Sequence, residues 1–336
     1  MNKQNNCMDL TKFILSICIV SIHTKFLNGY IYPWVRIAVP IFFIFSSYLF
    51  FKRIQNKSLE EKNKILKAFI VRNLKLYMCW FIILLPITIY IRKYFFYGII
   101  QGICTLVHDI LFGSTFLASW YIISSVIAVV LIFYLSKVIS NRIIFIISIP
   151  MYLLGCIATN YSFILLNSSI LTNLFSKIEI IFGVPSNNFM VALIWICIGK
   201  IIADNKDKLN DKKIISIKLI ISLLGLYLEY FILNNILKSD ANDCYLMLIP
   251  TAYFCALLVL NSNIKIKYHE ELRKISTTVY CMHFSIAVIL DNLIDLMNIR
   301  NPYHIATFLG TLVCSWITSI IILKTEKKIR ILQYTH

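Results

Sequence analysis

The feature that most constrains this chain is a succession of ten apolar segments, each about as long as a membrane-crossing α-helix. Their approximate bounds are 9–27, 32–51, 74–91, 119–135, 143–159, 187–202, 214–237, 243–260, 276–296 and 304–323. A soluble domain in which 59% of residues are hydrophobic and only 15% are charged would have too little polar surface to cover this apolar area. The sequence therefore predicts an all-α, polytopic membrane helical bundle that forms a single domain over residues 1–336.

Lysine and arginine are distributed unequally between alternate loops. One set of loops holds 26 of the 33 Lys and Arg residues. The other set holds seven, namely Lys25, Arg36, Arg92, Lys93, Lys177, Lys238 and Arg300. Because cytoplasmic loops are enriched in Lys and Arg, this split predicts ten spans with both termini in the cytoplasm. The short apolar piece from Gly98 to Phe112 is expected to be a re-entrant or interfacial helix, since an eleventh span would break the charge pattern.

The formal net charge of +17 does not indicate nucleic-acid binding, because the chain has no RNA- or DNA-binding motif and its basic residues occur in short runs between apolar segments. The ten cysteines are scattered singly, without a Cys-x-x-Cys pair. Scattered cysteines in apolar segments are typical of small core residues. We therefore expect neither a nucleic-acid partner nor a metal site.

The first apolar segment carries three ionisable residues, Asp9, Lys12 and His23. On an α-helix, Lys12 and His23 are almost three whole turns apart, so both face the same way at a separation of about 16 Å. Ionisable groups within a membrane helix are costly and usually face a protein interior or a wet cavity. This face of the helix is therefore predicted to line a site that crosses much of the membrane.

Further ionisable residues lie in or beside the other apolar segments, and most have an ordinary structural explanation. They are Arg36, Arg72, Lys75, Glu229 and His283. Arg72 and Lys75 fit interfacial anchors, Glu229 needs only a structural partner, and His283 fits a hydrogen-bonded position in the bundle. Arg36, expected at a depth similar to His23, is harder to explain in this way, because an imidazole titrates near neutrality while Arg keeps its charge.

Acyl transfer across the membrane is a reaction that this set could serve. Lys12, Arg72 and Lys75 would supply cations for the phosphates of cytoplasmic acetyl-CoA at the inner mouth. The pantetheine arm of acetyl-CoA is long and thin enough to reach into the bundle. The His23 imidazole would deprotonate an acceptor hydroxyl, and Arg36 would orient the acceptor or stabilise the developing oxyanion. Composition and spacing allow this reaction without requiring it.

Phrases along most of the chain resemble the acyltransferase 3 family of bacterial membrane proteins. The family's first span opens with an acidic residue, a basic residue three positions later and a His eleven positions after that, as in Asp9, Lys12 and His23. The other phrases are RIAVPIFFIFSSYLFFKR from Arg36, FIVRNLKLY from Phe69, SWYIIS from Ser119 and ISTTVYCMHFSI from Ile275, the last similar to Ser-x-x-x-Tyr-x-x-His. Within the family, Arg-x-Ala-Val-Pro-x-Phe-Phe looks closest to the membrane domain of the serine racemases of vancomycin resistance.

The resemblance implies a multi-pass protein of the bacterial inner membrane that moves acyl groups, usually acetyl from acetyl-CoA, to hydroxyls of cell-surface or exported glycans. It implies His23 as the catalytic residue, and the basic residues of the first and third spans as supports. Further supporting residues are expected to be Asp9, Glu229, Tyr280 and His283. Two positions depart from the family pattern. Lys12 replaces an Arg and loses bidentate phosphate binding, and Ser47 replaces a Gly but is still small enough for close helix packing.

A second interpretation is a small-molecule permease, for an amino acid such as serine, that uses the same cavity without chemistry. The membrane domain of the serine racemases is thought to handle serine import, and no racemase domain is expected here because the chain ends soon after the tenth span. A permease needs a midplane site with broken helices, whereas few prolines interrupt these spans. A glycan polymerase or flippase is a third interpretation, although those proteins are usually longer.

The expected partners are acetyl-CoA, an envelope glycan and membrane lipid. The sequence leaves open which glycan accepts the group, which acyl group is moved, whether a covalent acyl-enzyme forms and what the oligomeric state is.

Overall fold

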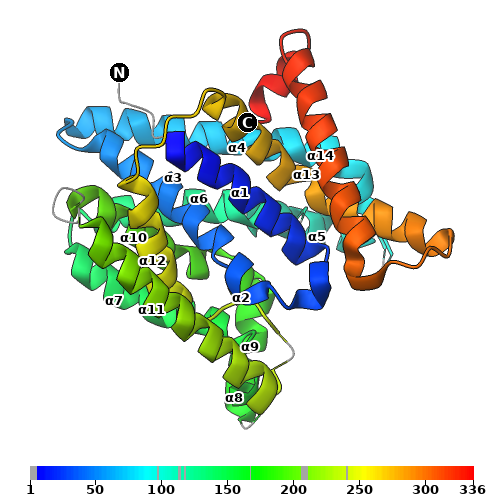
Figure 1. The fold of residues 1–336 in the computed structure, drawn as a ribbon, viewed down its shortest axis with the longest axis horizontal. Helices are drawn as coiled ribbons and strands as arrows, with labels where there is room; N and C mark the ends of the chain where they lie inside the picture. The colour runs from blue at the N-terminus through cyan, green and yellow to red at the C-terminus, as the bar shows by residue number, and fades with distance from the viewer. Residues whose placement is uncertain are drawn as a thin grey trace. The chain divides into compact units, whose positions relative to one another are not determined.

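A computed structural model of the chain describes residues 6–96, 98–112, 115–116, 119–166, 168–205, 211–239 and 241–336, and these residues form helices without any strand (Figure 1). Lys3, Lys206 and Lys208, which contribute to the predicted cytoplasmic charge, lie outside the described residues. The helices are α1 (Asn6–His23), α2 (Tyr32–Val35), α3 (Ala38–Ile54), α4 (Leu59–Arg92), α5 (Ile99–Phe112), α6 (Ser119–Leu135), α7 (Asn141–Ile157), α8 (Phe163–Leu166), α9 (Ser169–Phe182), α10 (Phe189–Asn205), α11 (Lys212–Phe231), α12 (Leu248–Leu260), α13 (His269–Leu296) and α14 (Ile305–Thr325).

Each of the ten predicted spans falls on one of these helices or on a pair of consecutive ones. Within the described residues, six helices are long and apolar enough to cross a membrane, or seven if the bent pair Ser169–Asn187 and Phe189–Asn205 forms one span. The spans predicted at α6, α7 and α12 fall on shorter apolar helices. The prediction of an all-α membrane bundle is therefore confirmed. The number of crossings and the side of the termini stay predictions.

The boundaries of two predicted elements differ from the sequence reading. The long helix α4 begins with a capping box, in which the Ser58 backbone N–H donates to Glu61 and the Glu61 N–H donates to the Ser58 hydroxyl, at 3.0 and 3.2 Å. Residues 59–73, which precede the predicted third span, therefore belong to the same continuous helix as that span. The eighth span begins at Leu248 instead of Asp243. Pro250 then occupies the first turn, where its missing N–H costs no helical hydrogen bond.

The chain forms two compact units. Unit 1 comprises Met1–Ala38, Val71–Ile122 and Asn263–His336, and unit 2 comprises Val39–Ile70 and Ile123–Ser262. In unit 1, α1 packs against α13, and α13 packs against α14 (Figure 1). The apolar core between these three helices contains Val20, Ile275, Val279 and Phe308. The Phe26 ring, just after α1, stacks on Phe308 with 4.1 Å between ring centroids, which holds the end of α1 against α14.

In unit 2, α7 packs against α10, and α11 packs against α12. Helix α3 also approaches α10 closely, because a Cβ atom added at Gly199 would lie 1.9 Å from the Ser47 hydroxyl oxygen and 2.6 Å from the Ile44 carbonyl oxygen. The buried Ser47 donates to the carbonyl oxygens of its own helix at Phe43 and Ile44. Close packing at Ser47, as predicted from its small size, thus depends on a glycine opposite it.

Candidate functional site

Two histidines from different helices lie together in unit 1. His23 is the last residue of α1 and is half-buried, whereas His283 lies in the middle of α13 and is 1% exposed. Their ring centroids are 5.1 Å apart and the ring planes are tilted by 39°. The Phe284 ring meets the His23 ring edge-on, with 6.0 Å between centroids. The predicted catalytic residue and a predicted supporting residue are therefore neighbours.

The hydrogen bonds of His283 fix which of its ring nitrogens carries the proton. Its Nδ1 lies 2.7 Å from the carbonyl oxygen of Tyr280 and 3.2 Å from that of Val279. Because carbonyl oxygens only accept, Nδ1 must be the donor, and Nε2 of the neutral ring then carries the lone pair. The Nε2 atom is buried and has no hydrogen-bond partner among the described residues. An acceptor with an unfilled lone pair thus lies beside His23.

Arg36 reaches the same end of α1 through a short connection. Helix α2 is tied to α1 by the Tyr32 hydroxyl, which donates to the Ile22 carbonyl oxygen at 3.3 Å. Arg36 follows α2 directly, and its guanidinium carbon lies 5.3 Å from the Tyr32 ring centroid. The charge of its guanidinium group acts on the His23 imidazole. Arg36 therefore lies near the end of α1 that carries His23, and its role there stays a prediction.

The first turns of α1 and α13 carry a second polar group. Asp9 is 5% exposed, and its Oδ2 accepts a hydrogen bond from His269 Nδ1 at 2.9 Å, with Arg273 Nη1 at 3.9 Å. The charge of Lys12 interacts with that of Asp9 and with two further cations, Arg273 and Arg72. We call Lys12, Arg72, His269 and Arg273 the basic cluster, with Asp9 as the carboxylate that anchors it.

The two polar groups lie at the same register on both helices. Asp9 meets His269 and His23 meets His283, so the spacing is fourteen residues on α1 and fourteen on α13. This spacing corresponds to almost four turns and about 21 Å. The two helices must therefore run parallel, as expected for a first and a ninth span. The basic cluster therefore lies near the beginning of both helices, and the imidazole pair lies at the end of α1 and the middle of α13.

Lys75, one turn after Arg72, contacts an aromatic ring near the C-terminus. Its ammonium group lies 4.7 Å from the ring centroid of Tyr334. The surrounding segment, Arg330–Tyr334, is held on α4 by the Trp80 indole N–H, which donates to the Thr335 carbonyl oxygen at 3.1 Å. Arg72 and Lys75 are both exposed. Lys75 is therefore an accessible cation that already has an aromatic partner.

Two other predicted supporting residues have structural contacts. Tyr280 is buried on α13, and its ring centroid lies 6.1 Å from that of His283 and 5.4 Å from that of Tyr121. Glu229 belongs to unit 2, where its carboxylate accepts hydrogen bonds from the Leu246 and Met247 backbone N–H groups at 2.6 and 2.8 Å. These N–H groups precede α12, so Glu229 caps that helix.

The Tyr161 hydroxyl also donates to Glu229, at 2.5 Å. Burial, together with this hydrogen bond and the nearby carboxylate charge, raises the pKa of the Tyr161 phenol. These contacts give Glu229 a structural role in unit 2.

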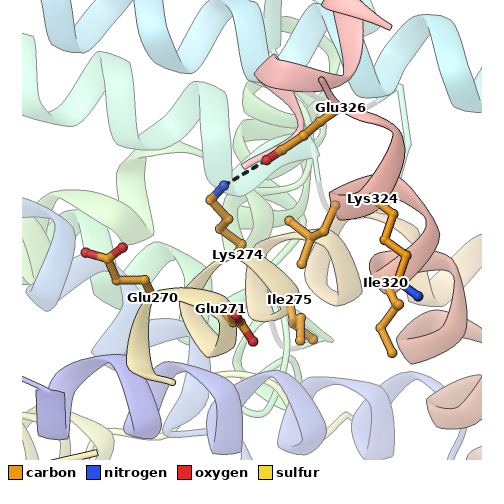
Figure 2. A pocket seen from close by; sticks show the side chains of 8 residues that line it. Glu270, Glu271, Lys274, Ile275, Ile320, Lys324 and Glu326 are labelled. Atoms are coloured by element: carbon orange, nitrogen blue, oxygen red, sulfur yellow. Dashed lines mark hydrogen bonds and ion pairs between the residues drawn. The ribbon is translucent and has the colours of Figure 1, made fainter. Parts of the chain in front are cut away.

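A cavity of about 370 Å³ lies between the first turns of α13 and the last turns of α14. Figure 2 shows Lys274 pointing toward Glu326, and the two side chains form an ion pair at 3.0 Å. The charged groups that line the cavity are Glu270, Glu271, Lys274, Lys324 and Glu326. Because three carboxylates and only two ammonium groups line the cavity, its charge does not favour the binding of a polyanion. The basic cluster is therefore the better candidate for binding phosphates.

His269 and Arg273 are site residues that the sequence reading missed. They precede the predicted ninth span, and the run HEELRK that contains them has the composition of a charged loop. The equal spacing of Asp9 to His23 and of His269 to His283 is a signal that would have identified the pairing. Among the described residues, no group of three or more His, Cys, Asp or Glu side chains is arranged to hold a metal ion.

Comparison with known proteins identifies the family. The sequence profile of the acyltransferase 3 family, described as an acyltransferase domain, matches residues 5–320. The chain belongs to the acyltransferase 3 family. As a member of that family with several apolar helices of membrane-spanning length, it is a multi-pass membrane protein. The family assignment supports acyl transfer as the class of activity.

Curated relatives of this acyltransferase 3 chain carry racemase names. It is 25% identical to an amino-acid racemase of Enterococcus faecalis over 98% of its own length and 48% of that protein. It is 23% identical to a serine/alanine racemase of Enterococcus gallinarum over 76% of its own length and 37% of that protein. The chain thus spans about half or less of the length of these relatives. No solved structure matches it.

Proposed function

We propose that this protein is an integral-membrane acyltransferase that moves an acetyl group from cytoplasmic acetyl-CoA to a hydroxyl of a cell-surface or exported glycan, in the inner membrane of a bacterium. The observation that carries the proposal is the pairing of α1 with α13. The beginning of this pair carries the basic cluster, and the end of α1 carries two neighbouring imidazoles near Arg36. A polyanionic donor that delivers a reactive group deep into the membrane needs both features.

At the donor end, Lys12, Arg72 and Arg273 would bind the phosphates of acetyl-CoA through charge-assisted hydrogen bonds. Asp9 keeps Arg273 and His269 in place and limits the repulsion between the cations. Lys75, which is exposed one turn beyond Arg72, would add a further cation. The pantetheine arm would then lie along α1 and α13 toward His23.

At the reacting end, His23 would act as general base. It would take the proton of the acceptor hydroxyl as the new C–O bond forms, and the thioester C–S bond would break with release of the CoA thiolate. The imidazolium would then return its proton to that thiolate. Arg36 would stabilise the negative charge that develops on the carbonyl oxygen. The proposal is supported by the position of His23 at the end of α1 and by the link between α1 and the segment that carries Arg36.

Binding of acetyl-CoA to the detergent-purified protein, measured by calorimetry, tests the donor site. We expect saturable binding and a dissociation constant that rises about tenfold in Lys12→Ala and in Arg72→Ala, since a hydrogen bond to a charged group contributes about 1.5 kcal/mol. Lys177→Ala is the matched control, because Lys177 is an exposed cation on α9 in unit 2. Absence of acetyl-CoA binding would contradict the proposal.

An amino-acid permease is the second candidate. It is favoured by the racemase names of the relatives and by the 43° bend between Ser169–Asn187 and Phe189–Asn205, since transporters use broken helices. Free serine is therefore the parallel ligand in the calorimetry. Saturable serine binding without acetyl-CoA binding would favour the permease.

A further inference from the structure

The unfilled lone pair of His283 Nε2 needs an explanation that packing does not supply. An acceptor buried without a partner costs about 1–3 kcal/mol, and an apolar side chain of similar size would avoid this cost. In His283 the Nδ1–H donates to a carbonyl oxygen of its own helix, but the unpaired Nε2 still destabilises the fold. The Nε2 atom therefore remains available to a hydrogen-bond donor that the resting arrangement does not provide.

His23 is the nearest ring that can supply such a donor. Two imidazoles joined by an N–H···N hydrogen bond of about 2.9 Å have centroids about 5.2 Å apart when the bonded nitrogens face each other. The observed separation is 5.1 Å, with a tilt of 39° between the planes. A rotation of the His23 ring in place would thus suffice to form the bond. His23 is half-buried at the last residue of α1, which leaves its ring less confined than that of His283.

We propose that His283 is a positioning residue whose Nε2 accepts a hydrogen bond from the N–H of His23. This inference rests on the proposed function, because it assigns His283 a task in the same reaction. The bond fixes the His23 tautomer and directs the lone pair of its other nitrogen to the acceptor hydroxyl. When His23 takes the proton of that hydroxyl, both of its nitrogens carry a proton and His283 continues to hold one of them. No proton moves to His283.

Histidine nitrogen NMR of the full-length protein in lipid bilayers tests the bond without requiring any activity. We expect a through-hydrogen-bond coupling between one nitrogen of His23 and one of His283 that disappears in His23→Ala. Absence of this coupling in the unaltered protein would overturn the inference. If the coupling is present while the protein releases no CoA from acetyl-CoA, the hydrogen bond stands and the proposed acyl transfer fails.

Turnover of acetyl-CoA, followed as released CoA thiol with water as the acceptor, tests the positioning role. His283→Phe, which keeps an aromatic ring but has neither ring nitrogen, is expected to lower kcat about 100-fold with the KM for acetyl-CoA unchanged. His283→Gln, which offers an amide oxygen near the position of Nε2, is expected to retain most of the lost activity. Equal kcat values for His283→Phe and the unaltered protein would overturn the role.

Discussion

Glu229 of unit 2 and His283 of unit 1 are both polar residues in apolar helices, yet they differ in how many of their hydrogen bonds are formed within the protein. Glu229 accepts three hydrogen bonds, from the Tyr161 hydroxyl and from two backbone N–H groups that precede α12. The Nδ1–H of His283 donates to the Tyr280 carbonyl oxygen, whereas its Nε2 is buried and has no partner in the part of the chain that the structure describes. A polar residue in a membrane helix is therefore not functional merely because it is there. What distinguishes the two is whether the fold itself completes the hydrogen bonds.

The largest effect on stability is expected for Glu229→Ala. Loss of the carboxylate removes the acceptor of three donors, so we expect the free energy of unfolding to fall by about 3 kcal/mol. Glu229→Gln, which retains one acceptor oxygen, should lose less. Reversible unfolding in mixed micelles measures both values, and the acetyl-CoA affinity of the folded variant should not change. If a Glu229 variant were as stable as the unaltered protein but no longer bound acetyl-CoA, Glu229 would have a functional role and not a structural one.

Gly199→Ala tests how closely α3 and α10 pack against each other in unit 2. The added methyl group would overlap the Ser47 hydroxyl and approach the Ile44 carbonyl oxygen at 2.6 Å, so we expect a loss of about 2 kcal/mol. Because the Ile44 oxygen belongs to the backbone, Gly199→Ala with Ser47→Gly should recover only part of this loss. Gly310→Ala on α14 is the control, since its nearest neighbour is the flexible end of Leu290 at 3.0 Å. Similar losses at both glycines would contradict this account.

Tyr161→Phe tests the Glu229 network by its pH dependence. Burial and the bond to Glu229 raise the pKa of Tyr161 above the unfolded value of about 10, so the neutral phenol stabilises the fold fully below pH 10. This contribution is lost as the pH rises through the folded pKa. We expect Tyr161→Phe to be less stable by about 1.5 kcal/mol at pH 8. Above pH 10, its stability should fall less steeply than that of the unaltered protein, and equal slopes would contradict the assignment.

The smallest effect on stability is expected for His283→Phe. Phenylalanine lacks both ring nitrogens, so the Nδ1–H bond to the Tyr280 carbonyl oxygen is lost while the cost of burying the unpaired Nε2 is relieved. Because these two effects oppose each other, the free energy of unfolding should stay within about 1 kcal/mol of that of the unaltered protein. The same unfolding measurement provides the comparison with Glu229→Ala. A loss as large as that of Glu229→Ala would place His283 among the structural residues and remove the contrast between the two units.

The helical membrane fold was predictable from the sequence, because long apolar segments with charged loops between them allow few alternatives. The pairing of α1 with α13 was not, since helical periodicity shows which face of α1 is polar but not which helix packs against it. Arg273 was read as loop charge because α13 extends seven residues before the predicted span. The roles of His23, Arg36 and the basic cluster stay predictions.

The most direct test of acyl transfer at His23 is to supply acetyl-labelled acetyl-CoA to inside-out membrane vesicles and to follow the label into the envelope glycan. Vesicles with the unaltered protein are expected to label the glycan. His23→Ala, expressed to the same level, should reduce the labelling rate by about 100-fold or more, the usual contribution of a general base. Labelling by His23→Ala at the rate of the unaltered protein would show that His23 does not carry out the transfer.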